Sequence, residues 1–213
     1  HYGIAREFTA LYKCPLKPLP QMTPPATAEG LKITILDSKR CPRYAALLME
    51  NVAPTPSPFW LQSRIWRVGM RPINILVDIT NYVMLSVGQP THGFDATHVK
   101  GEICVRVAKP SETLTLLNGK ELNLTDQDLV IADQTEPLAL AGIMGGSKDS
   151  ILDNTTKMIL EVANFHSIGT RKSAQRFDLR TEASVRFEKA IDPQRVDLAI
   201  SMARLLFKQE CPQ

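Results

Sequence analysis

Four polar side chains of three chemical types lie among apolar residues between positions 71 and 95. They are Arg71, Asn74, Asn81 and His92. An imidazole titrates near neutral pH and can pass a proton to or from a water molecule that attacks an ester. An arginine can hold an ester or a phosphate with a fork of hydrogen-bond donors. This stretch therefore contains groups that a hydrolytic or anion-binding site would use.

A mostly buried helix must position these groups. Apolar residues recur every four positions at Ile79, Val83 and Val87, which is a helical spacing. Gly88 suits the C-terminus of this helix. Pro90 then leaves it, so we expect His92 on a loop, where chemistry is usually done. From the residues alone, a structural histidine that fixes this loop is the more common alternative.

Glu161 is an acid inside the apolar run Leu160–Ala163. A carboxylate is costly to bury unless another group pairs with it. An ion pair with Arg71 or Arg171 explains Glu161 as well as a ligand-binding role does.

The glycines of LALAGIMGGSK do not form a phosphate-binding loop. The pattern GxxxxGK[ST] requires a glycine before Lys148, where Ser147 stands, so ATP binding is not indicated. Gly142, Gly145 and Gly146 either let the backbone approach a ligand or form a tight turn. We favour the turn for Gly145 and Gly146.

The composition, 44% hydrophobic and 22% charged over 213 residues, is that of a globular protein with one large or two small cores. The net charge of +3 is only a weak indication of a polyanionic partner. No apolar run reaches the ~18 residues that a spanning helix needs, so we expect neither membrane insertion nor secretion. The chain begins at His1, so we expect it to be part of a longer protein.

The cysteines are far apart in the sequence and have no histidines at zinc-ligand spacing. They are Cys14, Cys41, Cys104 and Cys211. Neither a metal site nor a disulfide framework is indicated, and a reducing, cytosolic setting fits best.

Periodicity predicts helices at both ends and strands in the middle. The helices expected are 3–13, 57–69, 78–88, 167–177 and one that opens at Asp192-Pro193. The strands expected are 31–35, 44–52, 102–108, 114–117, 129–132, 138–141 and 158–162. We expect the first two strands to form an antiparallel pair, Ser57 to cap its helix, and Asn118-Gly119 to form a hairpin turn. Strands flanked by helices without regular alternation indicate an α+β fold.

Six blocks carry a resemblance to a known family. They are RPIN, VDITNYVML, GQPTHGFD, LALAGIMGG, LEVANF and LRTEASVRFEKAIDP, all between Arg71 and Pro193. In order and spacing they resemble the central part of the bacterial phenylalanine-tRNA ligase beta subunit, over roughly Tyr44 to Leu206. In that family this region is the editing domain, which hydrolyses tyrosine wrongly attached to the phenylalanine tRNA.

The resemblance implies an α+β fold in which mixed and antiparallel sheets are flanked by helices. It also implies four segments: a tail helix of a preceding module at 1–14, a proline-rich linker at 15–28, the editing domain at 29–208, and the start of another linker at 209–213. The five prolines between Pro15 and Pro25 support the first linker independently.

The resemblance assigns roles to eight residues and implies no metal. His92, Arg71 and Thr181 would place the attacking and attacked groups, and Glu161 would accept a hydrogen bond from the hydroxyl of tyrosine. The remaining pocket positions are Asn81, Ala141, Gly142 and Ala183. His92 could act as a base, position the water or contact the terminal adenosine of the tRNA. Thr181 could instead be a helix cap.

The family also implies partners: tRNA(Phe) and the alpha subunit, in an assembly of two alpha and two beta chains in the cytoplasm. ATP, phenylalanine and magnesium bind mainly to the alpha subunit, so this chain would not charge tRNA alone. Thr91, Gly93 and Ile75 depart from the family pattern and put the shape of the loop at His92 in doubt. A non-catalytic tRNA-binding module is the alternative, with the basic segment Arg171–Arg180 either contacting phosphate or forming a solvated helix face.

Overall fold

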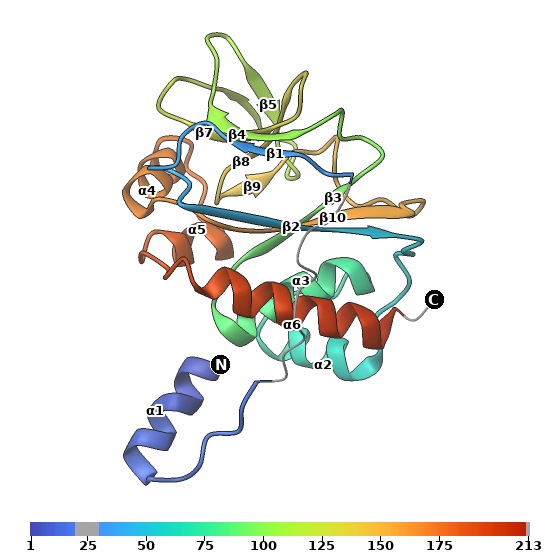
Figure 1. Ribbon diagram of the computed structural model, residues 1–213, viewed down its shortest axis with the longest axis vertical. Coiled ribbons are helices and arrows are strands. Elements are labelled where there is room, and N and C mark those ends of the chain that lie inside the picture. Colours follow the sequence, from blue (N-terminus) through green and yellow to red (C-terminus); the bar gives the residue numbers. More distant parts are fainter. Residues whose placement is uncertain (20–29, 212–213) are drawn as a thin grey trace.

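The computed structural model describes residues 1–19 and 30–211 and has three layers (Figure 1). A five-stranded sheet lies over a three-stranded sheet, and helices cover the free face of the latter. Those helices are α2 (Phe59–Arg67), α3 (Ile75–Val87) and α6 (Arg195–Glu210). The expected α+β fold is confirmed. The expected linker at 15–28 lies largely outside the described residues.

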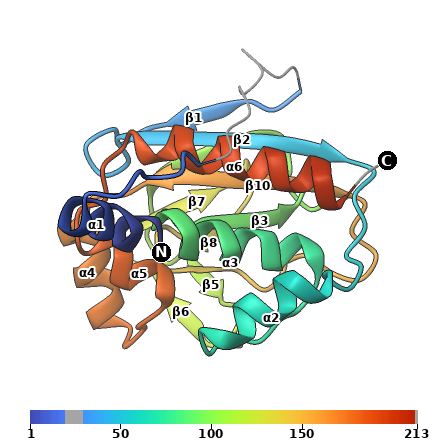
Figure 2. The same cartoon turned by 90° about the horizontal axis from the view of Figure 1, so that it is seen from below.

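The three-stranded sheet has a strand of eight residues in its centre. Its order is β2 (Arg43–Glu50), β10 (Lys157–Asn164), β3 (Thr91–Asp95). Both pairings are antiparallel. Viewed from the helical side, α3 and α6 lie across this sheet (Figure 2). Its central strand is therefore covered on both faces.

The five-stranded sheet corrects one expectation. Its order is β1 (Ile33–Ile35), β4 (Ile103–Val107), β7 (Leu129–Ala132), β8 (Pro137–Leu140), β9 (Met144–Gly145). β1 pairs in parallel with β4, so the predicted antiparallel pair of the first two strands is wrong. The expected hairpin is confirmed: β5 (Thr113–Thr115) pairs with β6 (Glu121–Asn123), and Gly119 in the turn has φ 81°.

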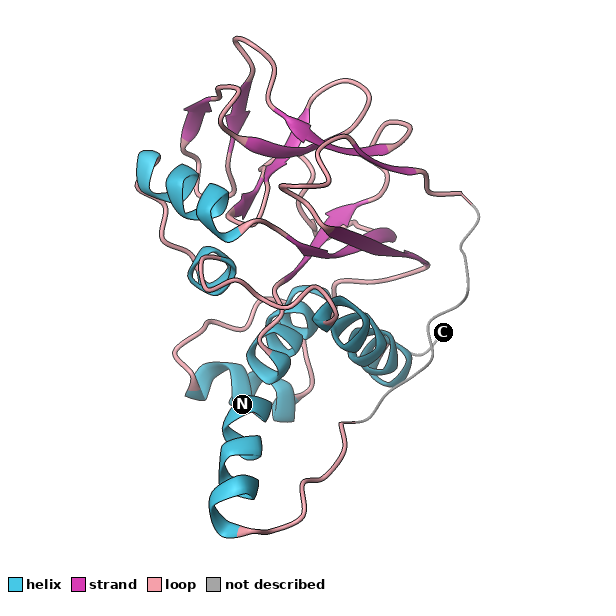
Figure 3. Ribbon diagram, turned by 60° about the vertical axis from the view of Figure 1, so that its left-hand side comes forward, coloured by secondary structure: helices cyan, strands magenta, loops and turns pink. Residues whose placement is uncertain are grey.

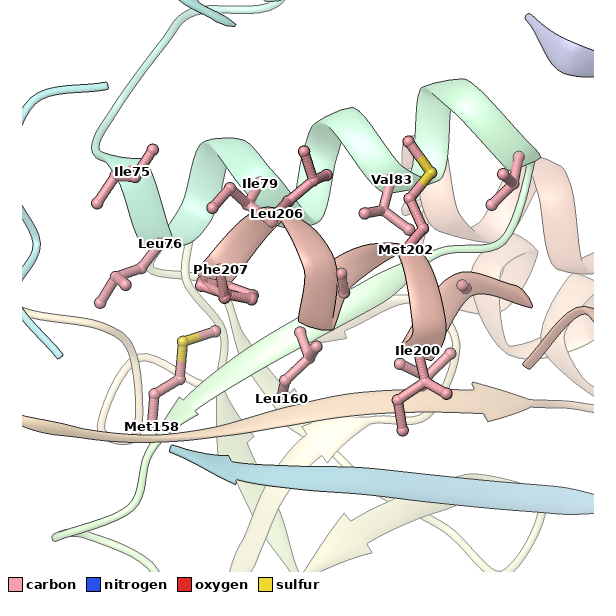
Figure 4. Close-up of a cluster of buried hydrophobic side chains, with 14 of the residues drawn as sticks. Ile75, Leu76, Ile79, Val83, Met158, Leu160, Ile200, Met202, Leu206 and Phe207 are labelled. Carbon is pink, nitrogen blue, oxygen red and sulfur yellow. The ribbon is translucent and has the colours of Figure 1, made fainter. Parts of the chain in front are cut away.

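Alternation along β10 separates two cores, because successive side chains of a strand point to opposite faces. Met158, Leu160 and Val162 pack with the apolar residues of α3 and α6. Figure 4 shows Met158 and Leu160 pointing at those helices. Ile159 and Ala163 instead pack against the five-stranded sheet. Glu161 shares this second face.

Local sequence fixes both ends of α3. The Asn74 side chain accepts a hydrogen bond of 3.0 Å from the backbone N–H of Val77, and Gly88 ends the helix with φ 79°. The expected C-terminus is confirmed. We expected Ser57 to cap α2, but it does not. Its hydroxyl instead donates a hydrogen bond of 2.5 Å to the buried Asp78. Asp78 also accepts from the Ile73 N–H, so it holds the segment before α3.

Three further helices complete the fold (Figure 3), and the first of them meets the C-terminal end of α3, where the amino group of His1 donates to the Leu85 carbonyl at 2.8 Å. They are α1 (Tyr2–Tyr12), α4 (Ser167–Arg176) and α5 (Glu182–Phe187). The apolar residues Ile4, Phe8 and Leu11 of α1 are exposed. α5 was not predicted, since six residues are too few to show a helical period. It nevertheless closes one side of the candidate site.

Candidate active site

A cavity of about 80 Å³ lies between the two larger sheets. By the water volumes seen in proteins, it has room for several water molecules. Thirteen residues line it: Pro90, Thr91, His92, Ile131, Ala139, Leu140, Gly142, Ile143, Met144, Gly145, Glu161, Ala183 and Phe187. Most are apolar, and His92 and Glu161 are its titratable groups. An apolar cavity with few polar groups is typical of a small-molecule site.

His92 and Glu161 are directly opposite each other on neighbouring antiparallel strands, β3 and β10. Opposite side chains in such a pair lie on the same face, with Cβ atoms about 4.5–5.5 Å apart. The sheet thus brings together two groups that are 69 positions apart in sequence. His92 is on a strand rather than on the loop that we predicted. Pairing with β10 holds it in place despite the family departures at Thr91 and Gly93.

Glu161 is a buried acid that lacks a compensating partner. The residue is 6% exposed, and its Oε2 has no hydrogen-bond partner in the described chain. Neither Arg71 nor Arg171 forms the ion pair that we had considered, since no described cation pairs with Glu161. Burial raises the pKa of Glu161 to about 8, and the neighbouring Tyr44 hydroxyl opposes part of this rise. The carboxyl is therefore mostly protonated at neutral pH.

The imidazole of His92 is neutral at the same pH. Desolvation lowers the pKa of His92 to about 4, because the surrounding atoms stabilise a charged ring less well than water does. The ring stands edge-on to Phe94 at a centroid distance of 4.7 Å. A neutral imidazole can both donate and accept a hydrogen bond.

Two glycines make room for these side chains. A Cβ on Gly145 would lie 2.5 Å from Nε2 of His92. Gly142 has φ 70°, and a Cβ there would lie 2.9 Å from the Phe165 ring and 3.2 Å from that of Phe187. We had favoured a turn role for Gly145, but it lies in β9 and forms part of the cavity wall.

Helix α5 supplies Ala183 and Phe187 to the cavity, and Thr181 caps that helix. The Thr181 hydroxyl accepts from the Ser184 N–H at 3.0 Å and donates to the Ile143 carbonyl at 2.8 Å. Thr181 does not itself line the cavity. The structure thus shows the capping alternative, and Thr181 reaches the cavity wall through Ile143 and through α5.

Three other predicted residues lie away from the cavity. Arg71 is exposed in the segment before α3 and does not line the cavity. Asn81 is half-buried on α3 and does not line the cavity. Ala141 lines a separate space of about 20 Å³ beside Phe165 and Thr170. Of the eight predicted site residues, the cavity therefore contains His92, Glu161, Gly142 and Ala183.

Sequence reasoning missed several wall residues and one neighbour of Glu161. Ile131, Met144 and Phe187 are ordinary apolar residues without a signal of their own. Tyr44 carried a weak signal, because it lies two positions from Ala46, the residue that pairs with Glu161. That signal becomes visible only when the strand register is known.

Two other classes of feature are absent from residues 1–19 and 30–211. These residues hold no group of three or more His, Cys, Asp or Glu side chains arranged to bind a metal ion. They include no helix with the length and apolar character needed to cross a membrane.

Comparison of the sequence with known proteins identifies the family to which this fold and cavity belong. Residues 40–212 match the B3/4 domain family, and the chain belongs to it. Its relatives include the phenylalanine–tRNA ligase beta subunit of Solibacter usitatus (strain Ellin6076), 43% identical over all of this chain and 28% of that protein. The beta subunits of Staphylococcus haemolyticus (strain JCSC1435) and Aquifex aeolicus (strain VF5) are 43% and 41% identical over 97% and 92% of this chain.

The chain spans about a quarter of the length of these relatives, 26% and 25% of the latter two proteins. A crystal structure of an N-terminal fragment of the phenylalanyl-tRNA synthetase beta subunit from Pyrococcus horikoshii aligns with a TM-score of 0.49. That alignment has 13% sequence identity and covers 83% of this chain and 56% of that chain.

Proposed function

We propose that this chain is an editing domain that hydrolyses the ester of tyrosyl-tRNA(Phe). The observation that carries the proposal is Glu161, a buried carboxyl with an unpartnered Oε2 in the wall of a mostly apolar cavity. Such a group is costly to retain, and a ligand hydroxyl would supply the missing hydrogen bond. His92 stands opposite it on the neighbouring strand.

The carboxyl would separate tyrosine from phenylalanine. A pocket shaped for phenylalanine rejects an analogue with one added hydroxyl only weakly, by ~100-fold in comparable sites. A pocket that requires the hydroxyl can discriminate by ~10⁴-fold or more, since phenylalanine leaves the buried acceptor unpaired. A second site with the opposite preference would remove the error and spare the correct product. The Glu161 side chain can pair with a phenol in either protonation state.

In the hydrolysis, the oxygen of water attacks the ester carbonyl, the bond to the ribose oxygen breaks, and that oxygen takes a proton. Neutral His92 is suited to hold the water or the terminal adenosine. With its pKa near 4, it is a weak base at neutral pH. The free hydroxyl of the terminal ribose could therefore share the proton transfer. Ala183 leaves space beside Phe187 for an aromatic ring.

The test is deacylation of tyrosyl-tRNA(Phe) and phenylalanyl-tRNA(Phe) by the complete synthetase. Glu161→Ala and Glu161→Gln should each lose preference for the tyrosyl ester. Lys157→Ala is the matched control, because Lys157 lies on the same strand and pairs with Glu50 at the surface. Unaltered removal of tyrosine by Glu161→Ala would rule out the selection role.

We further propose that the complete protein is the beta subunit of a cytoplasmic phenylalanine–tRNA ligase. It would act with an alpha subunit, in an assembly of two alpha and two beta chains, on tRNA(Phe). ATP and magnesium would serve the ligase reaction, mainly in the alpha subunit. Tight tRNA binding without deacylation by this assembly would favour the alternative of a non-catalytic tRNA-binding module.

A further inference from the structure

Behind the cavity, a second buried oxygen lacks a partner. The hydroxyl of Tyr44, like Oε2 of Glu161, is buried and makes no hydrogen bond in the described chain. The only other such atom in the described chain is Oε1 of Gln89, whose amide already donates to the Ala163 carbonyl at 2.7 Å. Buried polar atoms without partners are rare. Two of them beside one another indicate a polar arrangement that is incomplete without a ligand.

Strand register places Tyr44 and Glu161 on the same face. Tyr44 pairs with Ala163, and Ala46 pairs with Glu161, on neighbouring antiparallel strands. The two side chains are therefore diagonal neighbours, a relationship that long side chains can bridge. The Tyr44 hydroxyl is near enough to affect the pKa of Glu161, and the reverse also holds. Tyr44 does not line the cavity itself, so it stands behind the carboxyl.

We propose that Tyr44 is a positioning residue for Glu161: its hydroxyl donates a hydrogen bond to one carboxyl oxygen and leaves the other to accept the phenol of a bound tyrosyl group. This inference rests on the proposed function and assigns a specificity role to a residue outside the cavity wall.

The electrostatics favour this division of roles. Burial and the nearby acid raise the pKa of Tyr44, so its hydroxyl keeps its proton and remains a donor. A hydrogen bond from Tyr44 stabilises the ionised carboxyl and so lowers the pKa of Glu161. The other titratable groups near Glu161 are His92 on β3 and Cys41 before β2. Burial raises the pKa of the Cys41 thiol to about 12, so neither is charged at neutral pH. No titratable residue of β7, β8, β9 or α5 lines the described cavity.

The test compares Tyr44→Phe, Glu161→Gln and the double variant in the complete synthetase. A hydrogen bond to a neutral group corresponds to about 2- to 10-fold, so Tyr44→Phe should lower kcat/KM for tyrosyl-tRNA(Phe) by about that factor at neutral pH. Hydrolysis of phenylalanyl-tRNA(Phe) should change little. In the Glu161→Gln background, Tyr44→Phe should add less than about twofold, because coupled residues are not additive. Equal losses in both backgrounds would overturn the proposal.

Tyr82→Phe is the matched control. The Tyr82 hydroxyl accepts a hydrogen bond of 2.7 Å from Arg64 on the helical side of the sheet, so removal of this hydroxyl should leave selectivity unchanged. A second measurement is independent of activity. It follows the infrared band of the protonated Glu161 carboxyl as the pH is changed. The band is identified by its loss in Glu161→Gln. Tyr44→Phe should shift its titration to higher pH and Tyr82→Phe should not.

The two measurements separate the proposals. If the wild-type synthetase does not remove tyrosine but Tyr44→Phe shifts the carboxyl titration, the proposed function fails and the pairing of Tyr44 with Glu161 stands. An unshifted titration overturns the pairing whatever the activity. A thermal melt of each variant shows that any loss of activity occurs in folded protein.

Discussion

The imidazole of His92 lies against the Cα of Gly145, where a Cβ would come within 2.5 Å of Nε2. Gly145→Ala should therefore displace the ring. We expect a loss of deacylation of about 10- to 100-fold, since a misplacement of about 1 Å can cost 100-fold in rate. Rapid mixing of the variant with tyrosyl-tRNA(Phe) measures it. Gly3→Ala is the control, because nothing lies within 4 Å of a Cβ at Gly3. Full activity in Gly145→Ala would show that the position of His92 is unimportant.

Glu161 should make stability fall as pH rises. Its folded pKa of about 8 lies above the ordinary value of 4.5 for a glutamate, so the folded state binds the extra proton between these values. That contribution is complete below pH 4.5 and is lost as pH rises through 8. Glu161→Gln cannot ionise, so relative to wild type it should gain on the order of 1 kcal/mol per pH unit between pH 5 and 8. Urea melts across this range measure the gap, and a constant gap would contradict the burial of the charge.

His92 should have the opposite effect in acid. Its folded pKa of about 4 lies below the ordinary value of 6.5 for a histidine, so the unfolded state binds more protons between these values. Stability is therefore lost as pH falls from 6.5 to 4. His92→Gln removes this loss and should narrow the difference between its unfolding free energies at pH 6.5 and pH 4.5. Parallel curves for the two proteins would mean that the imidazole is solvated.

Thr181→Ala removes the cap of α5 and the bond to the Ile143 carbonyl. We expect the unfolding free energy to fall by about 1–2 kcal/mol. Thr181→Ser keeps a hydroxyl and should restore most of it. Denaturant melts of the three proteins make this comparison. Loss of activity in Thr181→Ala with unchanged stability would instead favour the direct role first predicted from sequence.

Arg71→Ala tests another role predicted from sequence. Because Arg71 is exposed and does not line the cavity, we expect kcat for tyrosyl-tRNA(Phe) deacylation to change by less than about twofold. Single-turnover assays separate this step from tRNA binding. A large fall in kcat would mean that Arg71 reaches the ester in the bound state.

Sequence patterns predicted most helices and strands because the buried faces repeat clearly. In α6, Val196, Ala199 and Ala203 are buried as expected. The pairing of β1 could not be predicted, because alternation identifies a strand but not its neighbour. The same limit applies to the site: the opposition of His92 and Glu161 depends on a register that no local pattern encodes. Tyr44 was missed for this reason.

β10 contributes to the helical core with Leu160 and to the cavity with Glu161, its next residue. A register shift of one residue would point Glu161 into the apolar core under the helices and Leu160 into the cavity. The burial of apolar side chains that opposes such a shift therefore also keeps Glu161 in the cavity. Substitutions on the face of β10 that packs against the helices can therefore alter substrate selectivity although none of those residues contacts the substrate.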